Sequence, residues 1–207
     1  MSDTTILLHG TFLSGHTHRV ELMLSLLDLP YRRVDAPAEV RRTPAFLALN
    51  PLGQIPVLVD GELVLADSNA ILVYLAKRYD ATGTWLPEEP IAAAAVQRWL
   101  SIAAGEVMYG PATARLVTLF GSAADPVRAT QIAERLLSFM EQHLAPRRYL
   151  AGETPTIADV ACYSYVAHAP EGRISLDPYA AVREWLVRVE ALPRFRPMPR
   201  SPVPDAA

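Results

Sequence analysis

An acidic residue and a serine, Asp67 and Ser68, stand directly before an apolar helical pattern that continues to Tyr79. A helix N-terminus carries about half a positive charge and unpaired N–H groups, so it attracts a carboxylate. The Ser68 hydroxyl could donate a hydrogen bond to that carboxylate, and the Asp67 carboxylate could accept one from an adjacent ammonium group. The pair therefore fits the zwitterionic head of an amino acid. The simpler alternative is that both residues only cap the helix.

The segment before this pair predicts the elements that position it. Residues 57–59 form a short apolar run, Asp60-Gly61 is a strong signal for a two-residue hairpin turn, and residues 63–65 form the return strand. Pro56 opens the first strand, where its missing N–H is tolerated. General frequencies favour a trans bond before this proline, since only about 5–6% of X–Pro bonds are cis.

The block of residues 50–79, NPLGQIPVLVDGELVLADSNAILVYLAKRY, strongly resembles the glutathione-binding half of the thioredoxin-like domain in glutathione transferases. Three features carry the resemblance: the NP-x-G-x-[IV]-P-x-L segment at 50–58, the two-strand turn, and the acidic residue and serine that open a helix. The resemblance extends over nearly the whole chain. It implies that the protein binds glutathione as a co-substrate.

The resemblance also assigns the parts of that site. It implies a cis Pro56, and it implies that the backbone of Ile55 pairs with the cysteinyl part of glutathione. Asp67 and Ser68 would then hold the γ-glutamyl end. The candidates for the glycyl end are Gln54, Arg41 and Arg42.

The chemistry implied is activation of the glutathione thiol. A free thiol with a pKa of about 8.5 is only a few per cent thiolate at neutral pH. One hydrogen bond to the charged form supplies roughly 1.5–3 kcal/mol, so a single hydroxyl donor before the first helix would be sufficient. Ser14 stands at that place, and residues 14–20, SGHTHRV, resemble the serine-type motif S-S-C-x-x-R-V of zeta-class transferases. An ordinary loop or cap serine is the alternative.

Two residues depart from that motif, since Gly15 replaces the second serine and His16 replaces the cysteine. The cysteine is linked to isomerase chemistry in that class, so its absence weakens the case for isomerisation. The tyrosine-type mechanism is not expected, because no tyrosine precedes Tyr31. His16 could stabilise a thiolate or orient a substrate, with an exposed first-turn histidine as the alternative. Thr11 and Thr17 are rival hydroxyl donors.

A second substrate should lie between the two domains. The expected wall residues are Phe12, Leu13, Tyr109 and Arg115. Tyr109 and Arg115 flank Gly110-Pro111, where an interior proline would kink a helix and open space. A role in the core or in a dimer interface is an equally good account of these residues.

The remaining pattern predicts the overall architecture. An α/β thioredoxin-like domain with a mixed four-stranded sheet (1–80) is followed by a linker (81–90), an all-helical bundle domain (91–193) and a proline-rich tail (194–207) that is extended or disordered. The expected strands are 5–8, 31–34, 57–59 and 63–65. The expected helical stretches are 16–29, 43–49, 68–79, 91–120 with a break at 110–111, 126–144, 160–166 after a capping box at 156–159, and 179–192.

Composition excludes several classes of function. The 207-residue chain has a net charge of −3 and no long basic run, which argues against nucleic acid and anionic membranes as partners. Its first residues do not form a signal peptide, and no apolar stretch reaches the roughly 20 residues that span a membrane. The single cysteine, Cys162, excludes an internal disulfide and a CxxC pair. No metal is expected, because the histidines do not cluster with carboxylates at ligand spacing.

These features predict a cytoplasmic, homodimeric glutathione transferase that conjugates the thiolate, stabilised by Ser14, to a small apolar electrophile. One alternative is a glutathione-dependent peroxidase, reductase or isomerase on the same fold. Another is a non-catalytic glutathione-binding or partner-docking protein. The intact 54–56 and 67–68 features argue against docking, whereas the departures at Gly15 and His16 favour it slightly. Trp99, Trp185 and Cys162 are expected in the core.

Overall fold

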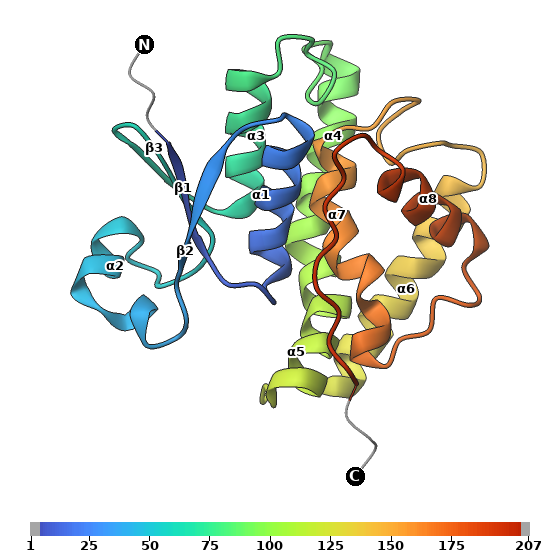
Figure 1. The fold of residues 1–207 in the computed structure, drawn as a ribbon. Helices are drawn as coiled ribbons and strands as arrows, with labels where there is room; N and C mark the ends of the chain where they lie inside the picture. Colours follow the sequence, from blue (N-terminus) through green and yellow to red (C-terminus); the bar gives the residue numbers. More distant parts are fainter. Residues whose placement is uncertain (1–4, 204–207) are drawn as a thin grey trace.

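A mixed four-stranded sheet, in the order β2-β1-β3-β4, forms the first part of the molecule (Figure 1). The computed structural model describes residues 5–203. Strand β1 (Ile6–Gly10) runs parallel to β2 (Tyr31–Asp35) and antiparallel to β3 (Val57–Asp60), which pairs with β4 (Leu63–Ala66) in a hairpin. The strand–helix–strand unit and the hairpin predicted from the sequence are therefore confirmed.

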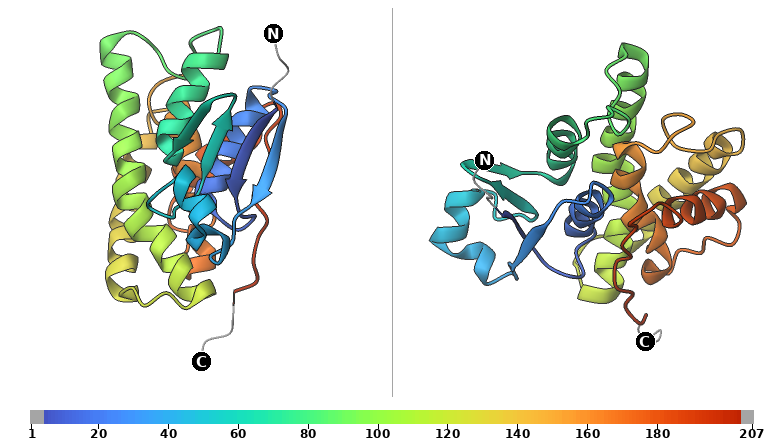
Figure 2. Two further views of the ribbon diagram at one scale, coloured as in Figure 1. Left: turned by 90° about the vertical axis from the view of Figure 1, so that its left-hand side faces the viewer. Right: turned by 45° about the horizontal axis from the view of Figure 1, so that its top comes forward.

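Helices cover both faces of this sheet. Helices α1 (Gly15–Leu26) and α3 (Ser68–Tyr79) lie between the sheet and the second part of the molecule, and α2 (Pro44–Leu49) lies on the other side (Figures 1 and 2). Helix α1 ends earlier than the predicted 16–29. The reason is that Asp28 adopts a positive φ of 57°, and the N–H of Leu29 bonds back to the Leu24 carbonyl at 2.9 Å, which closes the helix.

The second part of the molecule is entirely helical. Trp99, Trp185 and Cys162 are buried in its core, as predicted. Helix α7 packs against both α1 and α4, so it joins the bundle to the first part. None of the helices among the described residues is long and apolar enough to cross a membrane. The helices are α4 (Pro90–Ile102), α5 (Thr113–Phe120), α6 (Pro126–Leu144), α7 (Ile157–Ala167) and α8 (Ala180–Glu190), with a short 3-10 turn η3 (Ala169–Gly172). A similar turn, η1 (Val40–Arg42), precedes α2 in the first part.

A π-helix, η2 (Ala103–Ala112), connects α4 to α5, so the chain stays helical where the sequence predicted a break. Pro111 lies inside this wider helix. The Met108 carbonyl accepts both the N–H of Thr113 and its hydroxyl, the latter at 2.8 Å. Gly110 faces α6 so closely that a Cβ there would lie 2.9 Å from the Ala133 nitrogen. The proline is therefore accommodated by a change of helix type rather than by an open kink.

The chain beyond α8 has no regular secondary structure up to residue 203, and it runs between α1 and α7 (Figure 1). Met198 is buried, and the ring of Phe195 packs edge-on against Tyr163 with centroids 5.2 Å apart. This segment is extended, as expected, but it is docked rather than disordered. Residues 1–4, at the start of the predicted first domain, and 204–207, at the end of the predicted tail, lie outside the described residues.

Candidate functional site

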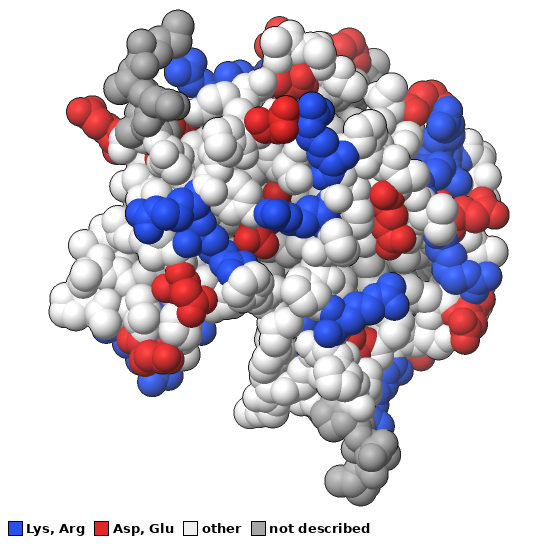
Figure 3. Space-filling view, viewed as in Figure 1, with Lys and Arg blue, Asp and Glu red and all other residues white. Residues whose placement is uncertain are grey.

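Three segments singled out from the sequence meet at one edge of the sheet. The register pairs His9 with Val57, which sets the loop after β1 beside the Ile55–Pro56 bond. The first turn of α1 reaches α3 through His16, whose Nδ1 lies 3.4 Å from the Ser68 hydroxyl. The loop after β1 comes down beside a notch between the two parts of the molecule, visible at the lower centre of Figure 3.

The Ile55–Pro56 bond is cis. The expectation from general frequencies was wrong here, and the geometry implied by the family resemblance is confirmed. Asn50 holds the preceding loop: its side-chain amide donates to the Gln54 carbonyl at 2.9 Å and its side-chain carbonyl accepts the N–H of Leu52 at 3.1 Å. Within residues 5–203, the backbone N–H and C=O of Ile55 make no hydrogen bond, so they can pair with a ligand.

Asp67 caps α3 with one of its two carboxylate oxygens. Its Oδ1 accepts the N–H groups of Asn69 and Ala70, both at 2.9 Å, and its backbone has a positive φ of 72°. The side chain is exposed, and among the described residues its Oδ2 has no hydrogen-bond partner. Capping therefore leaves one carboxylate oxygen able to accept from an ammonium group.

A buried arginine stands behind Ser68. Arg19 donates from Nη1 to the Ser68 hydroxyl at 2.8 Å and to the Asn69 side chain at 2.9 Å, while its Nε and Nη2 are buried without a hydrogen bond. Burial lowers the pKa of Arg19, and the nearby charge of Asp67 opposes this change. No carboxylate of the described residues forms an ion pair with Arg19. The start of α3 thus carries a full positive charge in addition to the helix dipole, which favours an anion.

Arg19 is the arginine of the SGHTHRV segment, and the sequence alone assigns it no role in the site. The available signal was the spacing, because an arginine five residues after the capping position, Ser14, lies in the second turn of α1. Its partners, Ser68 and Asn69, lie about 50 residues away in the chain, and no local pattern identifies them.

Ser14 is the N-cap of α1. Its Oγ accepts the N–H of Thr17 at 3.2 Å, and its own N–H bonds to the Thr11 carbonyl at 3.2 Å. Accepting uses the oxygen and leaves the hydroxyl hydrogen free to donate, and none of the described residues accepts it. Thr17 is fully buried beneath Gly10, and its hydroxyl oxygen accepts the N–H of Thr11 at 3.4 Å. Thr17 is therefore not placed to reach a ligand.

His16 is not the exposed first-turn histidine of the simpler interpretation. Its Nε2 lies 3.3 Å from the Met108 sulfur and its ring packs edge-on against Tyr165, with centroids 5.0 Å apart. Burial, assisted by the charge of Arg19, lowers the pKa of His16 to about 3. The imidazole is therefore neutral at pH 7, so it can form hydrogen bonds but offers no positive charge to a thiolate.

Gly15 departs from the zeta-type motif for a steric reason. A Cβ at this position would lie 2.7 Å from two ring carbons of Tyr165 on α7. The aromatic ring occupies the space that a serine side chain would need.

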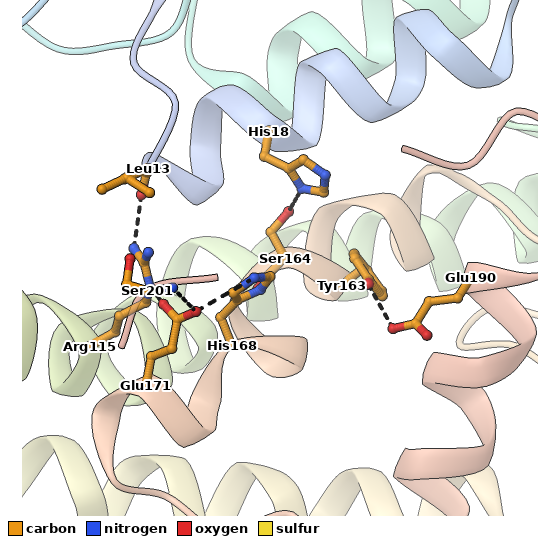
Figure 4. Close-up of polar contacts among 9 residues, drawn as sticks. All are labelled: Leu13, His18, Arg115, Tyr163, Ser164, His168, Glu171, Glu190 and Ser201. Carbon is orange, nitrogen blue, oxygen red and sulfur yellow. Dashed lines mark hydrogen bonds and ion pairs between the residues drawn. The ribbon is translucent and has the colours of Figure 1, made fainter. Parts of the chain in front are cut away.

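The expected wall residues of a second site are placed differently from one another. Phe12 is 59% exposed, with the Arg33 guanidinium 3.0 Å from its ring centroid, and Tyr109 is 62% exposed. Leu13 is half-buried. Arg115 is only 1% exposed and donates to the Leu13 carbonyl and to Glu171 (Figure 4). Arg115 therefore lies behind the loop, which agrees with the core alternative and not with a wall that contacts substrate.

Arg41 and Arg42 line a hollow of about 510 Å³ with Leu47, Leu52 and Gly53. The Nε of Arg41 is buried without a hydrogen bond, and Arg42 is exposed. This hollow adjoins the loop that leads to Gln54, and Leu47 on α2 also lines it.

Neither a metal centre nor a reactive protein thiol supports the site. The described residues contain no group of three or more His, Cys, Asp or Glu side chains that could hold a metal ion. Burial raises the pKa of Cys162 to about 12, and its S–H points to the Trp99 carbonyl at 3.8 Å. The protonated, buried thiol is not a nucleophile.

Comparison with known proteins gives consistent matches over both parts of the chain. Residues 13–78 match the family model for the glutathione S-transferase N-terminal domain, and residues 93–196 match that for the C-terminal domain. The chain is 34% identical to glutathione S-transferase 3 of Zea mays over 96% of this chain and 98% of that protein. It is 32% identical to the disulfide-bond oxidoreductase YfcG of Escherichia coli, over 85% and 86% of the two chains. The crystal structure of a glutathione S-transferase from Pseudomonas fluorescens superposes with a TM-score of 0.88 at 33% identity, covering 94% of this chain and 99% of that one.

Proposed function

Because the chain belongs to the glutathione S-transferase family, we propose that it binds glutathione at this edge of the sheet and transfers its thiolate to a small apolar electrophile. The observation that carries the proposal is the convergence of Ser14, the cis Ile55–Pro56 bond and the Asp67-Ser68 pair on one edge. A docking protein would need none of these three features. In line with other members of the family, we propose a cytoplasmic homodimer.

The γ-glutamyl end of glutathione would bind at the start of α3. Its carboxylate would face the hydroxyl and the backbone N–H of Ser68, since Asp67 already caps the N–H groups of Asn69 and Ala70, with the buried charge of Arg19 behind them. Its ammonium group would face the free oxygen of Asp67. A charge-assisted hydrogen bond of this kind is worth roughly 1.5–3 kcal/mol.

The rest of the tripeptide would extend along the neighbouring loop. The free backbone groups of Ile55 would pair with the cysteinyl residue, as strands pair in a sheet. Gln54 lies next to this position and is exposed. The glycyl carboxylate would lie toward the guanidinium groups of Arg41 and Arg42.

Ser14 would stabilise the thiolate by donating its free hydroxyl hydrogen. Lowering the thiol pKa by two units requires about 2.7 kcal/mol of preference for the thiolate. One charged hydrogen bond supplies roughly 1.5–3 kcal/mol and the N-terminus of α1 adds about 0.3–1 kcal/mol. His16 is neutral and Thr17 is buried, so Ser14 is the donor that fits best, with His16 adding a hydrogen bond at most.

The electrophile would lie in the notch, next to Phe12, Leu13 and Tyr109. The thiolate would attack its electron-poor carbon and form the C–S bond of the conjugate. In a substitution the leaving group departs with the electron pair of the broken bond, and in an addition the π pair of the activated double bond takes up a proton from water. A disulfide substrate is a second candidate, because one relative is a disulfide-bond oxidoreductase. In that case the same thiolate would attack one sulfur of the disulfide, forming a mixed disulfide with glutathione and releasing the other sulfur as a thiolate, since the protein's own cysteine is buried.

Calorimetric titration with glutathione, followed by ultraviolet titration of the bound thiolate against pH, tests this proposal. For Ser14→Ala we expect nearly unchanged affinity and a thiol pKa higher by about one to two units, since one charged hydrogen bond is lost. Ser138→Ala is the matched control, because this exposed serine bonds only to the Glu134 carbonyl on α6. A parent protein that does not bind millimolar glutathione would contradict the proposed function.

A further inference from the structure

A buried ion pair holds the loop that carries Ser14 from behind. Arg115, on α5, donates from Nη1 to the Leu13 carbonyl at 2.8 Å and from Nε to Glu171, on η3, at 2.5 Å. The two side chains are 1% and 8% exposed. Figure 4 shows the guanidinium between the loop and the carboxylate.

Fixing the Leu13 carbonyl also fixes the following residue. The Leu13 carbonyl and the Ser14 nitrogen belong to one planar peptide unit. The orientation of the carbonyl therefore sets the orientation of the Ser14 N–Cα bond. A hydrogen bond to a thiolate weakens steeply when its angle falls, so this orientation matters for the reaction more than for folding.

The surroundings leave Glu171 dependent on Arg115 and on one further donor. His168 Nε2 is 3.8 Å from Glu171, too far for a hydrogen bond, and the Nδ1 of His168 bonds to the Ser164 carbonyl at 2.8 Å. The further donor is the backbone N–H of Ser201, at 3.0 Å from Oε1. The docked C-terminal segment therefore completes the coordination of the carboxylate.

The packing around the pair leaves little room for readjustment. A Cβ on Gly172 would lie 2.7 Å from the backbone nitrogen of Arg115, so η3 packs directly against the backbone of α5. The side chains of Arg115 and Glu171 thus join the Leu13 loop, α5, η3 and residue 201.

We propose that Arg115 is a positioning residue for the transfer reaction: with Glu171 and the Ser201 N–H, it sets the orientation of Ser14 and couples it to docking of the C-terminal segment. This inference rests on the proposed function, in which Ser14 donates to the thiolate. Arg115 itself does not touch glutathione.

Arg115→Lys tests the inference, because lysine keeps the charge but loses the rigid fork that reaches two acceptors at once. Glutathione affinity is measured by calorimetry and the pKa of the bound thiol by ultraviolet titration, first for the parent protein. For the variant we expect a thiol pKa higher by about one unit, which is a roughly tenfold smaller thiolate-to-thiol ratio, with affinity changed less than about twofold. The matched control is Arg188→Lys, an arginine that likewise bonds a carbonyl, that of Arg148, and pairs with a glutamate, Glu184.

Two further variants keep the test decisive. The double variant Arg115→Met/Glu171→Leu removes both charges together, which a protein core tolerates better than one unpaired charge, and we expect it to fold and to show the same raised thiol pKa. A chain that ends at Arg200 removes the Ser201 N–H, and we expect a smaller shift in the same direction. An unchanged thiol pKa in the folded double variant would overturn the inference while leaving the proposed function intact. A parent protein without glutathione binding would overturn both.

Discussion

Asp67 combines a helix cap with a free carboxylate oxygen, and substitution can separate the two roles. Asparagine caps helices well and tolerates the positive φ found here, but it lacks the charge that would hold an ammonium group. For Asp67→Asn we expect glutathione affinity to fall by roughly 1.5–3 kcal/mol in calorimetry, with thermal stability nearly unchanged.

The matched control for this prediction is Asp125→Asn. Asp125 caps α6 with the same pattern, since its Oδ1 accepts the N–H groups of Val127 and Arg128 at 2.9 and 3.2 Å, and it lies outside the proposed site. If the two substitutions change affinity equally little, Asp67 is a cap and nothing more.

Sequence patterns predicted those site residues whose role is local. The hairpin signal at Asp60-Gly61 and the cap at Asp67 each depend on residues within a few positions, so spacing alone identifies them. The turn itself lies one residue later, at Gly61-Glu62, because Asp60 still pairs with Leu63. The roles of His16 and Arg115 depend on partners 92 and 56 positions away, Met108 and Glu171. No periodicity in the chain encodes which helix will lie across a gap. The sequence therefore left His16 open between a ligand contact and an exposed position, and Arg115 open between a substrate wall and the core.

At the scale of elements, the start of α7 depends on one buried carboxylate. Asp159 accepts the backbone N–H of Thr156 and of Leu150, both at 2.9 Å, and the indole N–H of Trp185 at 2.8 Å. The sequence predicted the capping box, which is confirmed, but not the two additional donors. The carboxylate therefore ties α7 to the preceding loop and to α8.

Replacing Asp159 should be costly for stability. Asp159→Ala leaves three N–H donors without a partner, each worth about 1–3 kcal/mol when buried, so we expect the free energy of unfolding in urea to fall by at least about 3 kcal/mol. The comparison is Asp125→Ala, an exposed cap for which a loss of about 1 kcal/mol is expected. Equal losses for the two variants would show that the buried contacts of Asp159 add nothing beyond capping.

The π-helix shows where element prediction from sequence stops. Gly110-Pro111 correctly indicated that an α-helix cannot continue unchanged. Whether the chain then kinks, ends or widens depends on the packing of η2 against α6, which requires a glycine at 110 because the Ala133 backbone is so close. That contact becomes visible only in three dimensions.

At the scale of the whole molecule, the C-terminal segment joins the two parts. His18, on α1, accepts at Nδ1 from the Ser164 hydroxyl of α7 and donates from Nε2 to the Arg196 carbonyl, both at 2.8 Å. Ser25 donates to the Arg194 carbonyl at 2.7 Å. Proline content correctly indicated an extended chain, but the docking depends on partners about 170 positions away and has no local signal.

Stability should therefore fall in mild acid. Burial lowers the pKa of His18 to about 4, below its ordinary value of 6.5. In the unfolded chain His18 is protonated at a higher pH than in the folded one. The stabilisation that comes from keeping His18 neutral is therefore complete above pH 6.5 and is lost as pH falls toward 4. In urea unfolding, we expect His18 alone to lower the free energy of unfolding by about 1.4 kcal/mol for each pH unit of acidification in this range.

His18→Gln isolates that contribution, because glutamine can still accept from Ser164 and donate to Arg196 but does not titrate. We expect the slope of unfolding free energy against pH to become smaller by about that amount, whatever the variant's stability at pH 7. The same slope in both proteins would mean that His18 is protonated equally in the folded and unfolded chains.

The contact between Gly15 and Tyr165 has a consequence for the evolution and engineering of this site. A single exchange of Gly15 to serine, which would bring the motif closer to the zeta type, creates a clash with an aromatic ring 150 positions later in the chain. The exchange becomes accessible only after Tyr165 has been replaced by a smaller residue, and that intermediate would leave a void in the packing against His16. The two positions are therefore epistatic: a library that varies only the loop will not recover the zeta-type sequence, whereas one that varies residues 15 and 165 together can.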